Sequence, residues 1–229
     1  MSDRVIVVGD IHGCAASLDA VVNAIDLRAS DTVVLLGDFI DRGIDSRGVL
    51  EQLIRLRTRC RLVAILGNHE EMFINARRSR SAFRFWLECG GGTTLDSYGF
   101  EMQLSLVPAA HVRFIESCVP YYETDNHIFV HAGYDPSLPL DRQDAHVLRW
   151  RSLHDGVPAR HVSNKTVVLG HTPHDEVYDG GHVVCIDTGS GVGGSLTAMD
   201  VTSGVVWQAD ERGRLRDVAT ARSVKGRQY

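Results

Sequence analysis

Asp, His and Asn side chains recur along this chain in short glycine-containing motifs, each of which follows an apolar segment. Carboxylates, imidazoles and amide oxygens are ligands that suit Mn²⁺, Fe and Zn²⁺. One carboxylate can bind two ions, because it has two oxygens. The motifs are Gly9–Gly13 (GDIHG), Gly37–Gly43 (GDFIDRG), Gly67–Glu70 (GNHE), His131–Gly133 (HAG) and Gly170–Thr172 (GHT). Together they predict a centre of two metal ions that share one carboxylate.

Individual residues can be assigned to this centre. Taken alone, a Gly-Asp after a strand is often a turn, and a lone Asn or His is more often a cap or a structural residue. Independent turns would not place metal ligands at five successive strand ends, so the joint pattern favours a hydrolase of phosphate esters with two metal ions. We expect Asp10 and His12 on the first ion, Asp38 bridging both ions, and Asn68, His131 and His171 on the second ion.

Composition limits the class of protein. The chain has 229 residues, of which 44% are hydrophobic, and one globular domain with a large core is expected. Charged residues make up 23% and the net charge is −5, which argues against a nucleic-acid partner. Neither a signal peptide nor a long apolar run is present, so we expect a soluble cytoplasmic protein without a membrane partner.

The elements that position the motifs alternate in type through the first third of the chain. Continuous apolar runs predict strands over Val5–Val8, Thr32–Leu36 and Leu62–Leu66. Apolar residues at helical spacing predict helices over Ala15–Leu27 and Ser46–Leu56. This βαβαβ order indicates parallel strands with helices outside, so the motif loops collect where the strands end.

The rest of the chain reads differently. Residues 71–126 carry helical signals broken by glycines and are expected to form one wall of a cleft. Residues 1–209 are expected to form a single catalytic domain, and residues 210–229 a loosely packed basic tail. A turn at Thr202–Gly204 suggests that the last two strands form an antiparallel hairpin. The later strands are expected at Ile128–Val130, Thr166–Leu169, Val183–Ile186, Ser195–Val201 and Val205–Ala209.

The motifs GDxHG, GDxxDRG and GNHE resemble those of the phosphoprotein phosphatase family of metallophosphoesterases. The similarity is greatest to the short bacterial branch typified by the bacteriophage lambda phosphatase. It extends to Trp86–Gly92, His146–Arg151, Gly170–Pro173 and Ile186–Gly189. The resemblance implies an α/β fold of the calcineurin-like type, a β-sandwich flanked by helices (α/β/β/α) with two metal ions, expected to be Mn²⁺ with Fe or Zn²⁺ as alternatives.

The same resemblance implies catalytic roles. A hydroxide between the ions would attack phosphorus in line. His69 would act as the general acid, and Asp41 would accept its hydrogen bond and favour its charged form. Arg42, Arg151 and Asn68 would contact the substrate phosphate. Taken alone, Asp41 and Arg42 could form a surface ion pair, and Arg151 could be a solvated helix residue.

Two positions depart from related patterns. Leu66 precedes GNHE, where protein phosphatases often have Arg, so one cationic substrate contact is missing or is supplied elsewhere. Pro173 replaces the last His of the Gly-His-x-His motif that is usual in the broader metallophosphoesterases, and His174 lies one residue too late. The second departure favours the phosphoprotein phosphatase type.

The expected function is therefore a serine/threonine protein phosphatase, with dual or tyrosine specificity as alternatives. Its substrate would be a phosphorylated protein or a small phosphoester. The alternative is a symmetrical diadenosine tetraphosphate hydrolase or a related nucleotide pyrophosphohydrolase, which Leu66 and the segment Asp187–Ala198 resemble. Asp41 and Glu70 favour the phosphatase, because the nucleotide enzymes tend to lack that Asp and to read GNHD.

A third interpretation is a phosphate-binding scaffold that has lost catalysis. Such a protein would be expected to have replaced Asp38 or His69, and both residues are present. The complete set of ligands, acid and arginine therefore favours an enzyme.

Overall fold

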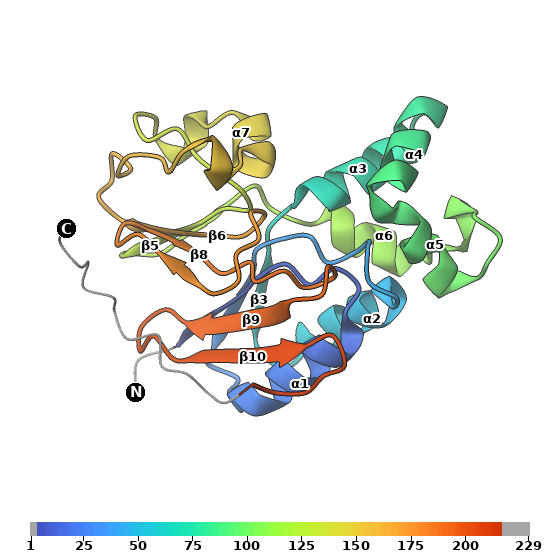
Figure 1. Cartoon of the computed structure of the whole chain (residues 1–229), viewed down its shortest axis with the longest axis horizontal. Helices are drawn as coiled ribbons and strands as arrows, with labels where there is room; N and C mark the ends of the chain where they lie inside the picture. The colour runs from blue at the N-terminus through green and yellow to red at the C-terminus, as the bar shows by residue number, and fades with distance from the viewer. Residues whose placement is uncertain (1–3, 217–229) are drawn as a thin grey trace.

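Two β-sheets pack face to face, with helices on the outer faces of the pair (Figure 1). The structure is a computed structural model and describes residues 4–216. The first sheet has the strand order β10-β9-β1-β2-β3 and the second the order β4-β5-β6-β8-β7. Both sheets are mixed, because each combines three parallel strands with antiparallel pairs, which lie on one side of the first sheet and at both edges of the second. The expected α/β sandwich is confirmed.

The strands are short, and those that carry the motifs lie side by side within each sheet. In the first sheet they are β1 (Val5–Val8), β2 (Thr32–Leu35), β3 (Arg61–Ala64), β9 (Ser195–Asp200) and β10 (Val206–Asp210). In the second sheet they are β4 (Tyr122–Glu123), β5 (His127–Phe129), β6 (Thr166–Leu169), β7 (Tyr178–Asp179) and β8 (Val183–Cys185). Strands β1, β2 and β3 run parallel, as do β5, β6 and β8, and β9–β10 is the expected antiparallel hairpin.

The central strands are apolar along most of their length because both of their faces are covered. Ile6 and Val8 of β1 belong to the core between the first sheet and its helices. Val7 points the other way, into the core between the two sheets, where Phe129 of β5 and Val168 of β6 meet it. Alternation along one strand thus fills two cores at once.

Seven α-helices complete the described part of the chain. Helices α1 and α2 cover the first sheet, and α3 to α6 pack beside them in the same hydrophobic core (Figure 1). A kink within Leu87–Gly91 joins α4 to α5, and it lies at Gly90, whose φ of 108° is a conformation that glycine adopts readily. The helices are α1 (Ala15–Ile25), α2 (Ser46–Leu56), α3 (Asn68–Ala76), α4 (Arg80–Trp86), α5 (Gly92–Tyr98), α6 (Ala109–Glu116) and α7 (Ala145–Trp150). No helix among residues 4–216 is long and apolar enough to cross a membrane.

Several element ends differ from the predicted ones. Helix α1 stops two residues before Leu27, because Asp26 adopts a left-handed conformation with φ 51°. Strand β3 stops at Ala64 instead of Leu66, because the next two residues pair with the segment after α6. The Leu66 amide donates to the carbonyl of Val119 at 2.9 Å. Such long-range pairing leaves no local signal in the sequence.

The end of the chain is only partly described. Asp210, the first residue of the expected tail, is the last residue of β10, and Leu215 pairs with Ala209 through an isolated bridge. Residues 211–216 therefore turn back on the sheet. The remainder of the predicted tail, 217–229, lies outside the described residues.

Candidate active site

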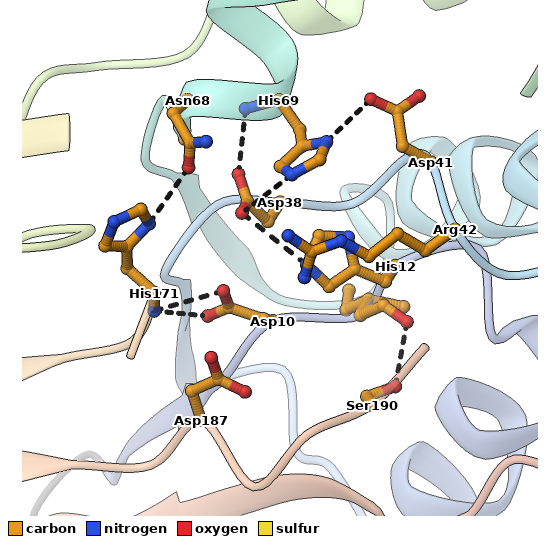
Figure 2. Close-up of polar contacts among 12 residues, drawn as sticks. Asp10, His12, Asp38, Asp41, Arg42, Asn68, His69, His171, Asp187 and Ser190 are labelled. Atoms are coloured by element: carbon orange, nitrogen blue, oxygen red, sulfur yellow. Dashed lines mark hydrogen bonds and ion pairs between the residues drawn. The ribbon is translucent and has the colours of Figure 1, made fainter. Parts of the chain in front are cut away.

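Loops that follow six parallel strands converge at one edge of the sandwich (Figure 2). Parallel strands that run side by side end at the same edge, which brings distant parts of the chain together. Five of these loops are the predicted motif loops, and the sixth follows β8. Their first polar side chains are Asp10, Asp38 and Asn68 after β1, β2 and β3, and His131, His171 and Asp187 after β5, β6 and β8.

Asp38 lies between two groups of candidate ligands. Its Oδ2 is 3.6 Å from Nε2 of His12, and its Oδ1 is 3.4 Å from Nε2 of His131. Ligand atoms of Asp38, His12 and His69 lie within 4.8 Å of one another, and so do those of Asp38, His131 and His171. The carboxylate expected to bridge two ions is therefore the one that the two groups share.

Backbone carbonyls set the orientation of two imidazoles. Nδ1 of His12 is 3.0 Å from the carbonyl of Ile40, and Nδ1 of His131 is 2.8 Å from that of Leu36. A carbonyl can only accept, so both Nδ1 atoms carry hydrogen and both Nε2 atoms present lone pairs to the centre. Burial lowers the pKa of His12 to about 3, which keeps the ring neutral.

The amide oxygen of Asn68 faces two imidazole nitrogens. It lies 2.8 Å from Nε2 of His131. It also lies 3.1 Å from Nδ1 of His171 (Figure 2). His171 also bonds to the Trp150 backbone, and burial lowers its pKa to about 4, so the nitrogen towards Asn68 has no proton. Three lone pairs thus converge with no hydrogen between them. A cation is what this donor set fits, and the residues match a divalent metal with nitrogen and oxygen ligands.

The buried carboxylates of the site also favour binding of a cation. Asp10 and Asp38 are each 2% exposed and Asp187 is 4% exposed. Burial, followed by repulsion from Asp187 and Asp38, raises the pKa of Asp10 well above its usual range. Glycine neighbours leave room for the carboxylates, since a Cβ at Gly170 would overlap Asp10 and one at Gly67 would overlap Asp38.

His69 and Asp41 form a separate pair beside the ligands. Nδ1 of His69 donates to Oδ2 of Asp41 at 2.7 Å. Trp86 donates to the same oxygen at 2.8 Å, and Thr94 donates to the other one at 2.7 Å. Burial alone would lower the pKa of His69, but the carboxylates of Asp38 and Asp41 raise it above the ordinary value. The geometry suits a charged imidazole that can give up a proton.

The Asp41–Arg42 turn aims both side chains. Both residues have left-handed backbones, with φ 73° and 66°, a conformation that is strained for side chains of this size. The turn is held by the Ser46 and Thr94 hydroxyls, which accept from the Asp41 amide, and by the Gly90 carbonyl, which accepts from the Arg42 amide at 3.3 Å. Nη1 of Arg42 lies 3.0 Å from Nε2 of His12, so the guanidinium points into the site.

Arg151 follows α7 and lies beside the loop that carries His131. Its side chain packs against Gly133, and Nη1 donates to the carbonyl of Tyr134 at 3.3 Å. The neighbouring Arg149 is instead bound to Glu71 at 2.6 Å. Of the two arginines, Arg151 is thus the one that forms no ion pair with a carboxylate among the described residues.

Two buried carboxylates were missed as site residues in the sequence. Glu70 accepts from the amides of Asp38 and Phe39 at 2.8 and 2.7 Å, so it ties the Asp38 loop to the start of α3. Asp187 begins a loop after a strand, as the other motif residues do, and that position was the available signal. His174 stays outside the cluster, with Nδ1 bound to the carbonyl of Thr172 at 2.7 Å.

A ligand cluster of this kind, set at the edge of a two-sheet sandwich, defines the class of metallophosphoesterases. The chain belongs to the calcineurin-like phosphoesterase family, whose sequence model matches residues 3–196. This confirms the expected relationship to phosphatases. The family uses a dinuclear metal centre, and the two candidate ligand groups that share Asp38 fit it.

Relatives span more than one named activity. Serine/threonine-protein phosphatase 1 of Salmonella typhimurium is 31% identical over 204 residues, covering 83% of this chain and 88% of the relative. A symmetrical bis(5'-nucleosyl)-tetraphosphatase of Paracidovorax citrulli is 44% identical over 64 residues, 28% of this chain and 22% of that protein. A crystal structure of a proposed diadenosine tetraphosphatase aligns over 92% of this chain and 94% of its own with a TM-score of 0.71 at 24% identity, which shows the shared fold.

Proposed function

We propose that the protein is a metal-dependent phosphomonoesterase that removes phosphate from phosphoserine and phosphothreonine in other proteins. The observation that carries this proposal is the 2.7 Å hydrogen bond between His69 and Asp41 beside the metal ligands. A positioned acid lets an alkoxide of high pKa depart as an alcohol. The similarity to a serine/threonine phosphatase over 83% of the chain supports the same substrate class.

Each residue has a part in the proposed reaction. Two divalent ions, proposed to be Mn²⁺, supply charge stabilisation and an activated water when bound to Asp10, His12, Asp38, Asn68, His131 and His171. His69 gives its proton to the leaving oxygen, and Asp41 keeps the ring oriented and charged. Arg42 and Arg151, with Asn68, bind oxygens of the substrate phosphate, since a guanidinium donates several hydrogen bonds in one plane.

A second candidate is hydrolysis of diadenosine tetraphosphate. The observation in its favour is the 44% identity over 64 residues to a symmetrical tetraphosphatase. Leu66 adds to it, because it leaves no cation before GNHE for a phosphoprotein. The hydrogen bond of Asp41 to His69 favours the first candidate, because that Asp tends to be absent from the nucleotide enzymes.

The test compares two substrates on metal-stripped protein, with and without added Mn²⁺. We expect phosphate release from a phosphoserine peptide that depends on Mn²⁺, with diadenosine tetraphosphate left intact. A phosphotyrosine peptide in the same assay measures side-chain preference. Turnover of the dinucleotide alone would contradict the proposal and favour the second candidate.

A further inference from the structure

Asp187 carries a carboxylate that its own loop does not require. The side chain is 4% exposed, and Oδ1 accepts from the amide of Gly189 at 3.0 Å. Among residues 4–216 no second donor reaches the carboxylate. Figure 2 shows the group directed towards Asp10, on the side of the site away from His69.

The surroundings of Asp187 are predominantly acidic. Its charge interacts with those of Asp10 and Asp38, and Arg42 and His174 act in the opposite direction on its pKa. Three buried carboxylates therefore share a region with one permanently charged guanidinium. Because like charges in a buried site repel each other, the metal-free protein must be destabilised by this arrangement.

A turn-forming role does not account for this placement. Asp200 shows what a buried turn carboxylate looks like in this protein: it is 6% exposed, and both its oxygens are used. Its Oδ1 accepts from the Thr202 amide at 2.9 Å, and its Oδ2 accepts from the Ser203 hydroxyl at 2.7 Å. Asp187 uses only one oxygen in its turn, and an Asn would serve there equally well.

We propose that Asp187 is a third carboxylate of the metal centre, placed beside Asp10, and that it strengthens binding of the ion held by Asp10 and His12. This inference rests on the proposed metal dependence of the enzyme. Residues that support the ligands of a metal typically change its affinity by about 10–100-fold when they are replaced. We expect a loss of that size for Asp187→Asn.

The test measures binding and stability instead of turnover. Metal-stripped wild-type and Asp187→Asn proteins are titrated with Mn²⁺ by calorimetry, and their Tm values are recorded with and without the ion. The Asn side chain keeps the acceptor for Gly189, so the loop is retained. We expect weaker Mn²⁺ binding, a higher Tm without metal because a repulsion is removed, and a smaller rise in Tm on adding Mn²⁺.

Two further variants make the result decisive. Asp187→Glu keeps the charge and should bind Mn²⁺ more tightly than the Asn variant does. Asp200→Asn is the matched control. Asp200 lies in β9 of the first sheet, at the end away from the metal ligands, so its replacement should lower Tm while leaving the Mn²⁺-induced rise unchanged. The inference is overturned if Asp187→Asn binds Mn²⁺ as tightly as wild type, or if it lowers Tm in the way Asp200→Asn does. If the wild type itself binds no Mn²⁺, the proposed function fails along with it.

Discussion

The four histidines of the site lie in two contrasting environments. His12 and His131 are buried and His171 is half-buried among metal ligands, and burial lowers the pKa of each, which favours neutral rings. His69 is as buried as His12, but the carboxylate of Asp41 accepts a hydrogen bond from it and its pKa is raised. Neutral rings offer lone pairs to a cation, whereas a charged ring offers a proton.

Different parts of the fold support the two environments. The ligand cluster lies where strands of both sheets end, and backbone carbonyls orient its rings. The acid pair is held by the helical segment, where Trp86 ends α4 and Thr94 lies in α5. In the first region, lone pairs of the ligand atoms face one another. In the second, both carboxylate oxygens of Asp41 already accept hydrogen bonds. The comparison indicates that metal binding and proton donation can be disrupted separately.

The largest effect is expected from Asp38→Asn. This change removes the one carboxylate that faces both groups of ligands, so both ions should bind more weakly. Because metal ions contribute several kilocalories per mole to such reactions, we expect kcat/KM to fall by about 10³-fold or more. Metal content by mass spectrometry and rates on p-nitrophenyl phosphate provide the measurement. Wild-type metal content in this variant would contradict the shared-ligand role.

His69→Asn should separate the two environments. We expect a loss of about 10²–10⁴-fold with an alkyl phosphate, whose leaving group needs a proton. The loss should be much smaller with p-nitrophenyl phosphate, because nitrophenolate leaves unprotonated. Bound metal should be unchanged. Equal losses on both substrates would show that His69 does not act as the acid.

Asp41→Asn should reduce the rate by about 10–100-fold, the value of a hydrogen bond to a charged group. It should also change the pH profile. The Asp41 carboxylate helps to raise the pKa of His69, so an amide in its place lowers that pKa, and the acid form is lost at lower pH. The alkaline limb of kcat against pH should therefore move to lower pH. An alkaline limb at the wild-type pH would show that Asp41 does not influence the pKa of His69.

Trp86→Phe is expected to have the smallest effect. It removes the indole N–H that donates to Asp41 at 2.8 Å but preserves most of the packing of a fully buried ring. We expect the free energy of unfolding to fall by about 1–2 kcal/mol and activity to fall by less than about tenfold. Urea unfolding and the same rate assays would show this. A loss as large as that of His69→Asn would mean that the indole has a further role.

Much of the site could be predicted because its functional residues directly follow the strands in the sequence. Apolar runs mark the parallel strands, and parallel strands place Asp10, Asp38 and His131 at one edge although they are far apart in sequence. The contacts of Glu70 and Trp86 could not be predicted. Each is a hydrogen bond across about thirty residues or more, and no local periodicity encodes it. Asp187 had a signal in its position after a strand, but a single Asp-Thr-Gly is also a common turn.

The most direct test of the central claim is a Mn²⁺ titration of metal-stripped wild-type protein, with bound ions and release of phosphate from a phosphoserine peptide followed together. The account predicts that two ions bind per chain and that turnover appears as the sites fill. Full turnover in protein verified to contain no metal would contradict the account, because the converging lone pairs around Asn68 would then need no cation.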